Sequence, residues 1–93
     1  MVREVEAGHI LVKTEEKAKE LRNKIILGSS FEDLAREFSI CPSGKKGGSL
    51  GWFGRGMMVK EFENAAFTLQ KGVTSQPIKT EFGWHLIKVI NTR

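Results

Sequence analysis

The sequence has few of the features that would place it in a secreted, membrane or disordered class. It has one cysteine, Cys41, so no internal disulfide can form and a small disulfide-stapled scaffold is excluded. Its apolar runs are only a few residues long, as at residues 25–27, whereas a membrane-spanning helix needs about 18. The start of the chain mixes charges of both signs and lacks the apolar segment of a secretory signal. We therefore expect a cytoplasmic protein with no membrane partner.

The composition indicates one folded domain with a modest basic charge. Of the 93 residues, 40% are hydrophobic and 28% are charged, which is enough apolar content for a single core over residues 1–93. The net charge is +4, and the basic residues of 13–24 alternate with glutamates, as on a solvated helix surface. A weak nucleic-acid contact stays open as an alternative for the locally unopposed basic residues, which are Lys45, Lys46, Arg55 and Lys60.

Side-chain spacing predicts one strand and two helices in the first half of the chain. The aliphatic and β-branched run that ends residues 4–13 is typical of a buried strand. Thr14 suits a helix N-cap and acidic residues follow it, so a helix is expected over residues 15–27. A second helix is expected to begin after a serine cap and to extend over residues 31–38, where apolar residues recur at helical spacing.

The second half of the chain predicts one further helix and three strands. Residues 39–56 are rich in glycine and read as a loop that leads into a short strand at 50–53. Apolar residues at i, i+3, i+4 and i+7 predict an amphipathic helix over 62–69, and two strands are expected at 76–80 and 84–91. The order β-α-α-β-α-β-β favours an α+β domain with a four-stranded, mostly antiparallel sheet flanked by helices.

The two histidines lie in the two longest predicted strands. Strand alternation puts His9 and Leu11 on one face of the first strand, and His85, Ile87 and Val89 on one face of the last. If these two strands pair at the centre of the sheet, the histidines are expected to lie side by side.

Five sequence motifs follow one another along the chain: HILV at 9–12, FEDLAREFS at 31–39, GGSLGWFGRG at 47–56, FENAAF at 62–67 and TEFGWH at 80–85. Together these motifs resemble the parvulin family of peptidyl-prolyl cis/trans isomerases. The likeness covers nearly everything from residue 8 to residue 91 and is strongest to the short, single-domain prokaryotic parvulins. The order and spacing of the motifs carry it, because each motif alone is a weak signal.

The resemblance implies a set of site residues. His9 and His85 match the paired histidines at the floor of the family's site, and Thr80 matches the residue that hydrogen-bonds to them. Cys41 matches a position at the mouth of the site where family members carry cysteine or aspartate. The implied substrate-binding positions are Leu50, Met58 and Phe62 in the proline-ring pocket and Phe67 and Phe82 in its supporting wall.

Two further positions bear on specificity and on local structure. Phosphate-directed parvulins carry an arginine-bearing insertion after the first strand, whereas here Lys13 leads directly into Thr14 and Glu15. The resemblance therefore implies a site that is indifferent to phosphorylation and accepts ordinary, apolar residues before proline. Ser49 stands where the family more often has aspartate, which leaves a local turn contact open.

The residues leave several chemical roles open. The histidine pair is compatible with direct catalysis and with a satisfied polar element of the core. Cys41 is compatible with nucleophilic attack, but acceptance of aspartate at its position favours an electrostatic or orienting role. A metal site built from Cys41, His9 and His85 lacks short ligand spacing and a fourth ligand, and we expect no metal and no other cofactor.

Two classes of function follow from the sequence. The leading hypothesis is an isomerase that acts on X–Pro bonds in proline-containing peptides and unfolded proteins. The alternative is a chaperone-like binding module that holds extended or proline-containing segments without turnover. A monomer is expected in either case.

Overall fold

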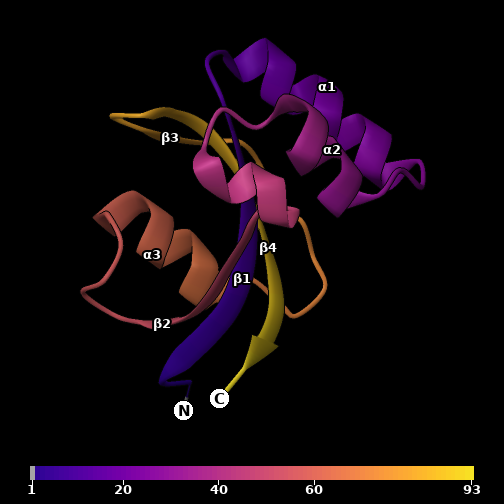
Figure 1. Ribbon diagram of the computed structural model, residues 1–93. Helices are drawn as coiled ribbons and strands as arrows, with labels where there is room; N and C mark the ends of the chain where they lie inside the picture. Colours follow the sequence, from indigo (N-terminus) through magenta and orange to yellow (C-terminus); the bar gives the residue numbers. More distant parts are fainter. Residues whose placement is uncertain (1) are drawn as a thin grey trace.

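A computed structural model describes residues 2–93, and Met1 of the predicted domain lies outside them. These residues form a four-stranded antiparallel sheet with strand order β2-β1-β4-β3. Helices cover both faces of the sheet, so the predicted α+β class and element order are confirmed (Figure 1). The strands are β1 (Glu4–Val12), β2 (Ser49–Gly54), β3 (Ile78–Thr80) and β4 (Gly83–Thr92).

The helices begin at the caps that the sequence indicates. In α1 (Glu15–Ile26) the Thr14 hydroxyl accepts the Lys17 N–H at 3.1 Å, and in α2 (Phe31–Phe38) the Ser30 hydroxyl accepts the Asp33 N–H at 3.2 Å. Each bond satisfies one of the free amides of the first helical turn. The third helix, α3, is Lys60–Thr68.

The structure shortens one expected strand and adds one element. The strand expected at 76–80 is reduced to β3, because Pro77 has no N–H for a ladder. Within the expected loop, a 3₁₀ helix, η1, spans Pro42–Lys46. Its five residues are too few for a periodic apolar pattern. No helix among residues 2–93 is long and apolar enough to cross a bilayer.

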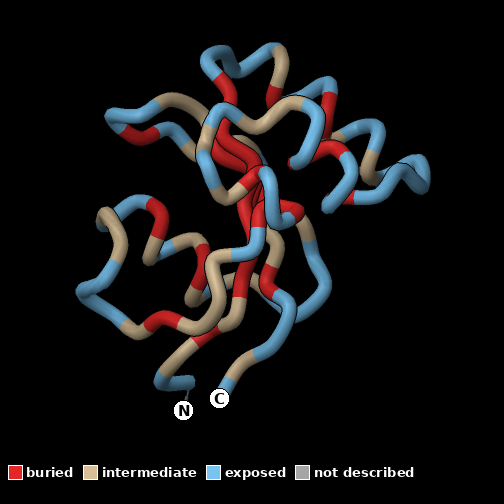
Figure 2. The backbone as a smooth tube through the Cα atoms, in the orientation of Figure 1, coloured by how far each residue is buried: buried red, intermediate tan, exposed pale blue. Residues whose placement is uncertain are grey.

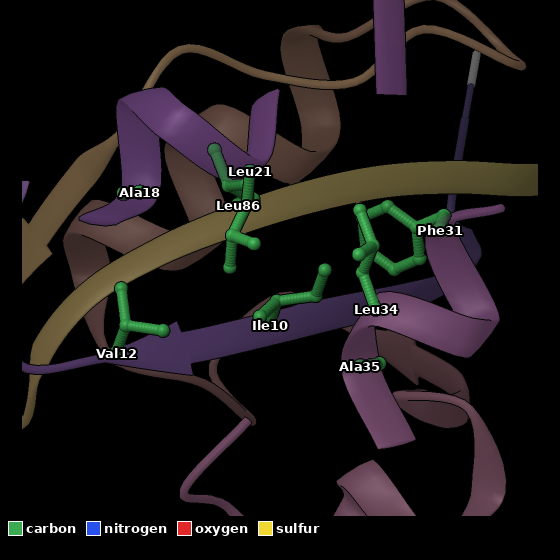
Figure 3. Packing of buried hydrophobic residues seen from close by; sticks show 8 residues of the cluster. All are labelled: Ile10, Val12, Ala18, Leu21, Phe31, Leu34, Ala35 and Leu86. Atoms are coloured by element: carbon green, nitrogen blue, oxygen red, sulfur yellow. The ribbon is translucent and has the colours of Figure 1, made fainter. Parts of the chain in front are cut away.

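Strand alternation divides the core into two parts. Ile10 and Val12 of β1 and Leu86 of β4 face α1 and α2, where they meet Leu21 and Phe31 (Figure 3). The opposite face of the same strands packs on α3 in a second cluster. That cluster includes Val5, Ala7, Phe53, Phe62, Ala66 and Ile87. Burial is densest along β1 and β4, which lie between the helices (Figure 2).

The register of β1 and β4 brings the two histidines together on the α3 side of the sheet. Leu11 pairs with His85 and His9 pairs with Ile87, so the imidazoles occupy diagonal positions of one antiparallel ladder. The condition for adjacent histidines is met, because β1 and β4 are the two inner strands and pair with each other.

The segment between α2 and β2 lies along the edge of β1 and closes one side of the histidine face. Ile40 N–H donates to the Leu11 carbonyl and His9 N–H donates to the Gly48 carbonyl, both at 2.9 Å. Gly48 has φ +86°, and a Cβ there would overlap the His9 carbonyl oxygen. Only glycine allows this close approach.

Candidate active site

His9 and His85 form a buried pair at the base of the candidate site. Their Nδ1 atoms are 3.0 Å apart, and their ring centroids are 5.2 Å apart with the planes tilted by 16°. The exposed fractions are 6% for His9 and 4% for His85. A distance of 3.0 Å between two ring nitrogens requires a proton on one of them.

The pair belongs to a longer chain of hydrogen bonds that links four elements of the fold. At one end Thr80 Oγ1 lies 2.7 Å from His85 Nε2 and accepts the Phe82 N–H at 3.2 Å. At the other end His9 Nε2 lies 3.1 Å from Ser43 Oγ, and the Ser43 hydroxyl donates to Cys41 Sγ at 3.3 Å. The chain therefore runs from β3 through the two central strands to η1.

With the Ser43 hydroxyl as the donor to Cys41, counting protons assigns one direction to this chain. Because the single Ser43 proton is donated to Cys41, His9 Nε2–H must be the donor to Ser43. His9 Nδ1 then accepts from His85 Nδ1–H, and His85 Nε2 accepts the Thr80 hydroxyl proton. Each group uses its one proton and both imidazoles are neutral. This direction assigns one proton to each ring, on Nε2 of His9 and on Nδ1 of His85.

Burial keeps both imidazoles neutral. Loss of solvation, and secondarily the proximity of His85, lowers the pKa of His9 from 6.5 to about 4. Loss of solvation also lowers the pKa of His85. At pH 7 the floor of the site therefore holds no full charge on either ring.

A largely apolar cavity of about 560 Å³ opens above the histidine pair. Its walls include three residues that the sequence analysis assigned to the proline pocket, and the mouth includes Cys41 and Phe82. The assigned wall residues are Leu50, Met58 and Phe62. A cavity of this size holds more than one amino-acid residue.

Phe62 joins the cavity wall to the histidine pair. Its ring meets His9 and His85 edge-on, with centroid distances of 5.5 and 5.4 Å, and it is only 4% exposed. The Phe53 ring supports it from the core at 6.0 Å. Phe62 is therefore the wall residue that packs directly against both histidines.

The rim of the cavity is apolar and exposed. Ile40, Met57 and Phe82 are 50%, 67% and 60% exposed, and all three line the cavity. Of these three residues, only Phe82 was predicted from the sequence. The sequence signal for Ile40 and Met57 was adjacency, because Ile40 precedes the predicted site residue Cys41 and Met57 precedes Met58. No sequence signal identified Ser43 as a site residue. Leu11, Pro42 and Val59 also line the cavity and were not predicted as site residues.

Two of the residues named from the sequence lie outside the cavity lining. Thr80 stands behind His85, where it is buried and hydrogen-bonded to the ring. Phe67 packs on Phe53 at 6.2 Å and lies beneath the Arg55 guanidinium, 4.5 Å from ring centroid to Cζ. Phe67 is therefore placed to support the wall from behind, and direct substrate contact by it stays a prediction.

The basic residues singled out in the sequence belong to different parts of the fold. Arg55 is paired with Glu63, with Nη1 and Oε2 3.3 Å apart. Lys45 and Lys46 end η1, whereas Lys60 begins α3. Nucleic-acid association stays a prediction. Within residues 2–93, no group of three or more His, Cys, Asp or Glu side chains is placed to hold a metal ion.

Comparison with known proteins assigns the family. The model of the rotamase family, described as the PPIC-type PPIase domain, matches residues 9–91. The foldase protein PrsA of Geobacillus kaustophilus is 54% identical over 86 residues, which are 91% of this chain and 31% of that protein. The chain thus spans about a third of the length of such curated relatives.

Solved structures agree with this assignment. NmPin, the parvulin of Nitrosopumilus maritimus, superposes with a TM-score of 0.89 at 47% identity, over 98% of this chain and 99% of that one. A Campylobacter jejuni chain from a study of PEB4 and Cj1289, described as SurA-like chaperones, gives a TM-score of 0.93 at 42% identity over all of this chain and 40% of that chain. The chain belongs to the PPIC-type, or parvulin, family of peptidyl-prolyl isomerases.

Proposed function

We propose that this domain accelerates rotation about X–Pro bonds without forming a covalent bond to its substrate. The observation that carries the proposal is the apolar cavity whose floor is a neutral, hydrogen-bonded histidine pair. Proline-containing peptides and unfolded protein segments are the proposed substrates.

The cavity suits the physical demands of this reaction. Amide resonance opposes rotation with a barrier of roughly 18–20 kcal/mol, and no bond to a heavy atom has to break. A twisted amide is less polar than a planar one, so a dry apolar cavity stabilises it relative to the ground state. An acceleration of about three to five decades needs on the order of 4–7 kcal/mol of such differential stabilisation.

The side chains divide this work between holding and orienting. Phe62, Leu50 and Met58 enclose a proline ring in the cavity and leave the preceding carbonyl free to swing. His9 and His85 present a rigid, uncharged surface beneath it, because each ring has a hydrogen-bond partner at both of its nitrogens. Cys41 stands at the mouth, held by Ser43, and in this proposal it orients the amide electrostatically and does not attack it.

Independence from phosphorylation is part of the proposal. The connection between β1 and α1 is only two residues long, Lys13 and Thr14, and leaves no insertion to carry arginines. The residues that line the cavity include no lysine or arginine. A phosphoserine before proline would lose its hydration at this rim and gain no cation.

Exchange NMR on unphosphorylated Xaa-Pro peptides tests the isomerase proposal. Wild type is expected to accelerate cis/trans exchange, Cys41→Asp to retain most of the activity, and Cys41→Ser to remain active. Phe62→Ala is expected to abolish the activity, and Phe62→Leu, which keeps more of the buried volume, to retain part of it. Loss of activity in both cysteine variants, with a trapped tetrahedral adduct of the Cys41 thiol on the amide carbonyl in wild type, would overturn the non-covalent mechanism.

A holding function is the second candidate, favoured by the exposed apolar rim of Ile40, Met57 and Phe82. Such a rim suits extended apolar segments as well as proline. Chemical-shift changes on peptide addition without faster exchange would support holding over turnover. A monomeric state and a cytoplasmic location stay predictions; sedimentation of the purified chain and fractionation of its cells test them.

A further inference from the structure

The loop between β2 and α3 supplies much of one wall of the cavity. It runs from Arg55 to Val59, and Met57, Met58 and Val59 all line the cavity. The loop belongs to no strand or helix, and Val59, the N-cap of α3, provides no side-chain cap. Something other than regular secondary structure must therefore hold these three side chains in place.

Glu63 of α3 reaches back across this loop and binds it at two points. One carboxylate oxygen, Oε1, accepts the Gly56 backbone N–H, and the other, Oε2, accepts from the Arg55 guanidinium at 3.3 Å. The Glu63 side chain is only 16% exposed. The Arg55 guanidinium in turn stacks on the Phe67 ring.

The two bonds of Glu63 differ in strength. The Arg55 side chain is 60% exposed, so water and salt screen its attraction to Glu63 and the ion pair contributes little. The bond from the Gly56 amide goes to a charged acceptor that is mostly shielded from water, and bonds of this kind are the stronger class. The backbone bond is thus the main attachment of the loop.

We propose that Glu63 is a positioning residue that keeps the Arg55–Val59 loop in the conformation that closes the substrate cavity. This inference rests on the proposed isomerase or holding function of the same cavity. It gives Arg55 and Phe67 a shared role behind the wall, since one stacks on the other beside Glu63.

The proposal predicts a specific kinetic signature. If the loop is open in most molecules, the apparent affinity for peptide equals the affinity of the closed form multiplied by the fraction of molecules in which the loop is closed. Once substrate has selected the closed loop, the chemistry above the histidines is unchanged. Weakening the attachment should therefore raise KM and leave kcat nearly constant.

Four variants separate the parts of this attachment. Glu63→Ala removes both bonds, and we expect KM to rise about tenfold with kcat within about twofold of wild type. Glu63→Gln keeps an oxygen acceptor for the Gly56 N–H and is expected to recover most of the affinity. Arg55→Ala should change KM less than threefold. Glu61→Ala, an exposed residue of the same helical turn, is the matched control and should behave as wild type.

The measurements are kcat and KM from exchange NMR, together with peptide Kd from chemical-shift titration and hydrogen exchange of the Gly56 amide. Faster Gly56 exchange in Glu63→Ala but not in Glu63→Gln is expected. A KM and Gly56 exchange rate in Glu63→Ala equal to those of Glu61→Ala would overturn the proposal. So would equal losses in Glu63→Gln and Glu63→Ala.

These results are distinguishable from failure of the proposed turnover. If wild type binds peptide without accelerating exchange, the Kd values of the four variants still test Glu63. If Glu63→Ala does not fold, the comparison of Glu63→Gln and Arg55→Ala with wild type decides through the Gly56 exchange rate and Kd. Near wild-type values in Glu63→Gln then support the backbone attachment, and a loss larger than that of Arg55→Ala opposes it.

Discussion

Ser43 is the residue that connects the histidine pair to Cys41. It accepts from His9 Nε2–H and donates to Cys41 Sγ, so it fixes both the tautomer of the first and the position of the second. This role follows from two distances, 3.1 and 3.3 Å, and from the single proton of a hydroxyl.

Replacing Ser43 with alanine should disturb the tautomers of both histidines. His9 Nε2–H would lose its acceptor, at a cost of about 1–2 kcal/mol of folding stability, and the pair could then reverse its direction of donation. We expect the isomerisation rate to fall about tenfold and the imidazole ¹⁵N shifts to report mixed tautomers. Ser43→Thr, which keeps the hydroxyl, serves as control. Unchanged ¹⁵N shifts in Ser43→Ala would contradict the assigned direction.

Some of these site residues are predictable from the sequence and others are not, for a physical reason. The positions of His9 and His85 on matching strand faces follow from period-two alternation, which is a local property. Ser43 carries no such signal, because its role depends on the fold bringing η1 against the end of β1. Thr80 and Phe67 were named through the family likeness, which does not separate residues that line the cavity from residues that support it.

At the scale of elements, the segment that joins α2 to β2 closes the histidine face only because Gly48 lets two backbones approach. A substituent at Gly48 would overlap the His9 carbonyl oxygen and would sit at φ +86°. Gly72 has the same φ of +86° but no neighbouring atom within 4 Å of the position of a Cβ. The two glycines therefore separate backbone strain from steric overlap.

Alanine at each of these glycines should have a different cost. Gly72→Ala is expected to lose about 1–2 kcal/mol of folding stability through left-handed strain alone. Gly48→Ala should lose at least about 3 kcal/mol, because overpacking against the His9 carbonyl adds to the strain. Urea unfolding of both variants checks this. Equal losses would show that the contact with β1 is unimportant.

Helices and strands are predictable from the sequence where interactions between residues close in sequence determine them. The caps of α1 and α2 are set by Thr14 and Ser30, which bond to amides three residues ahead, and both helices begin where expected. The 3₁₀ helix η1 was not predicted, because five residues are too few to show a periodic spacing of apolar side chains. The shortening of β3 reflects Pro77, whose effect on a sheet edge depends on its neighbours in space.

For the molecule as a whole, the buried histidine pair links folding to pH. The pKa of His9 is lowered to about 4 in the folded state, and an unfolded histidine titrates near 6.5. Between these values the unfolded chain binds more protons than the folded one, so stability falls as the pH falls. Above about 6.5 both states are neutral at this residue and the effect vanishes.

We expect wild type to lose stability steadily from pH 6.5 downwards, on the order of 3 kcal/mol from His9 by pH 4, with His85 adding in the same direction. Measuring the urea midpoint between pH 7 and 5 keeps most carboxylates ionised and isolates the histidines. The chain has two histidines, so the double variant His9→Gln/His85→Gln removes this titration entirely. Its midpoint should be flat over the same range. A wild-type midpoint that is equally flat would mean that the pair accepts a proton without cost, and that neutrality of the cavity floor is not maintained by burial.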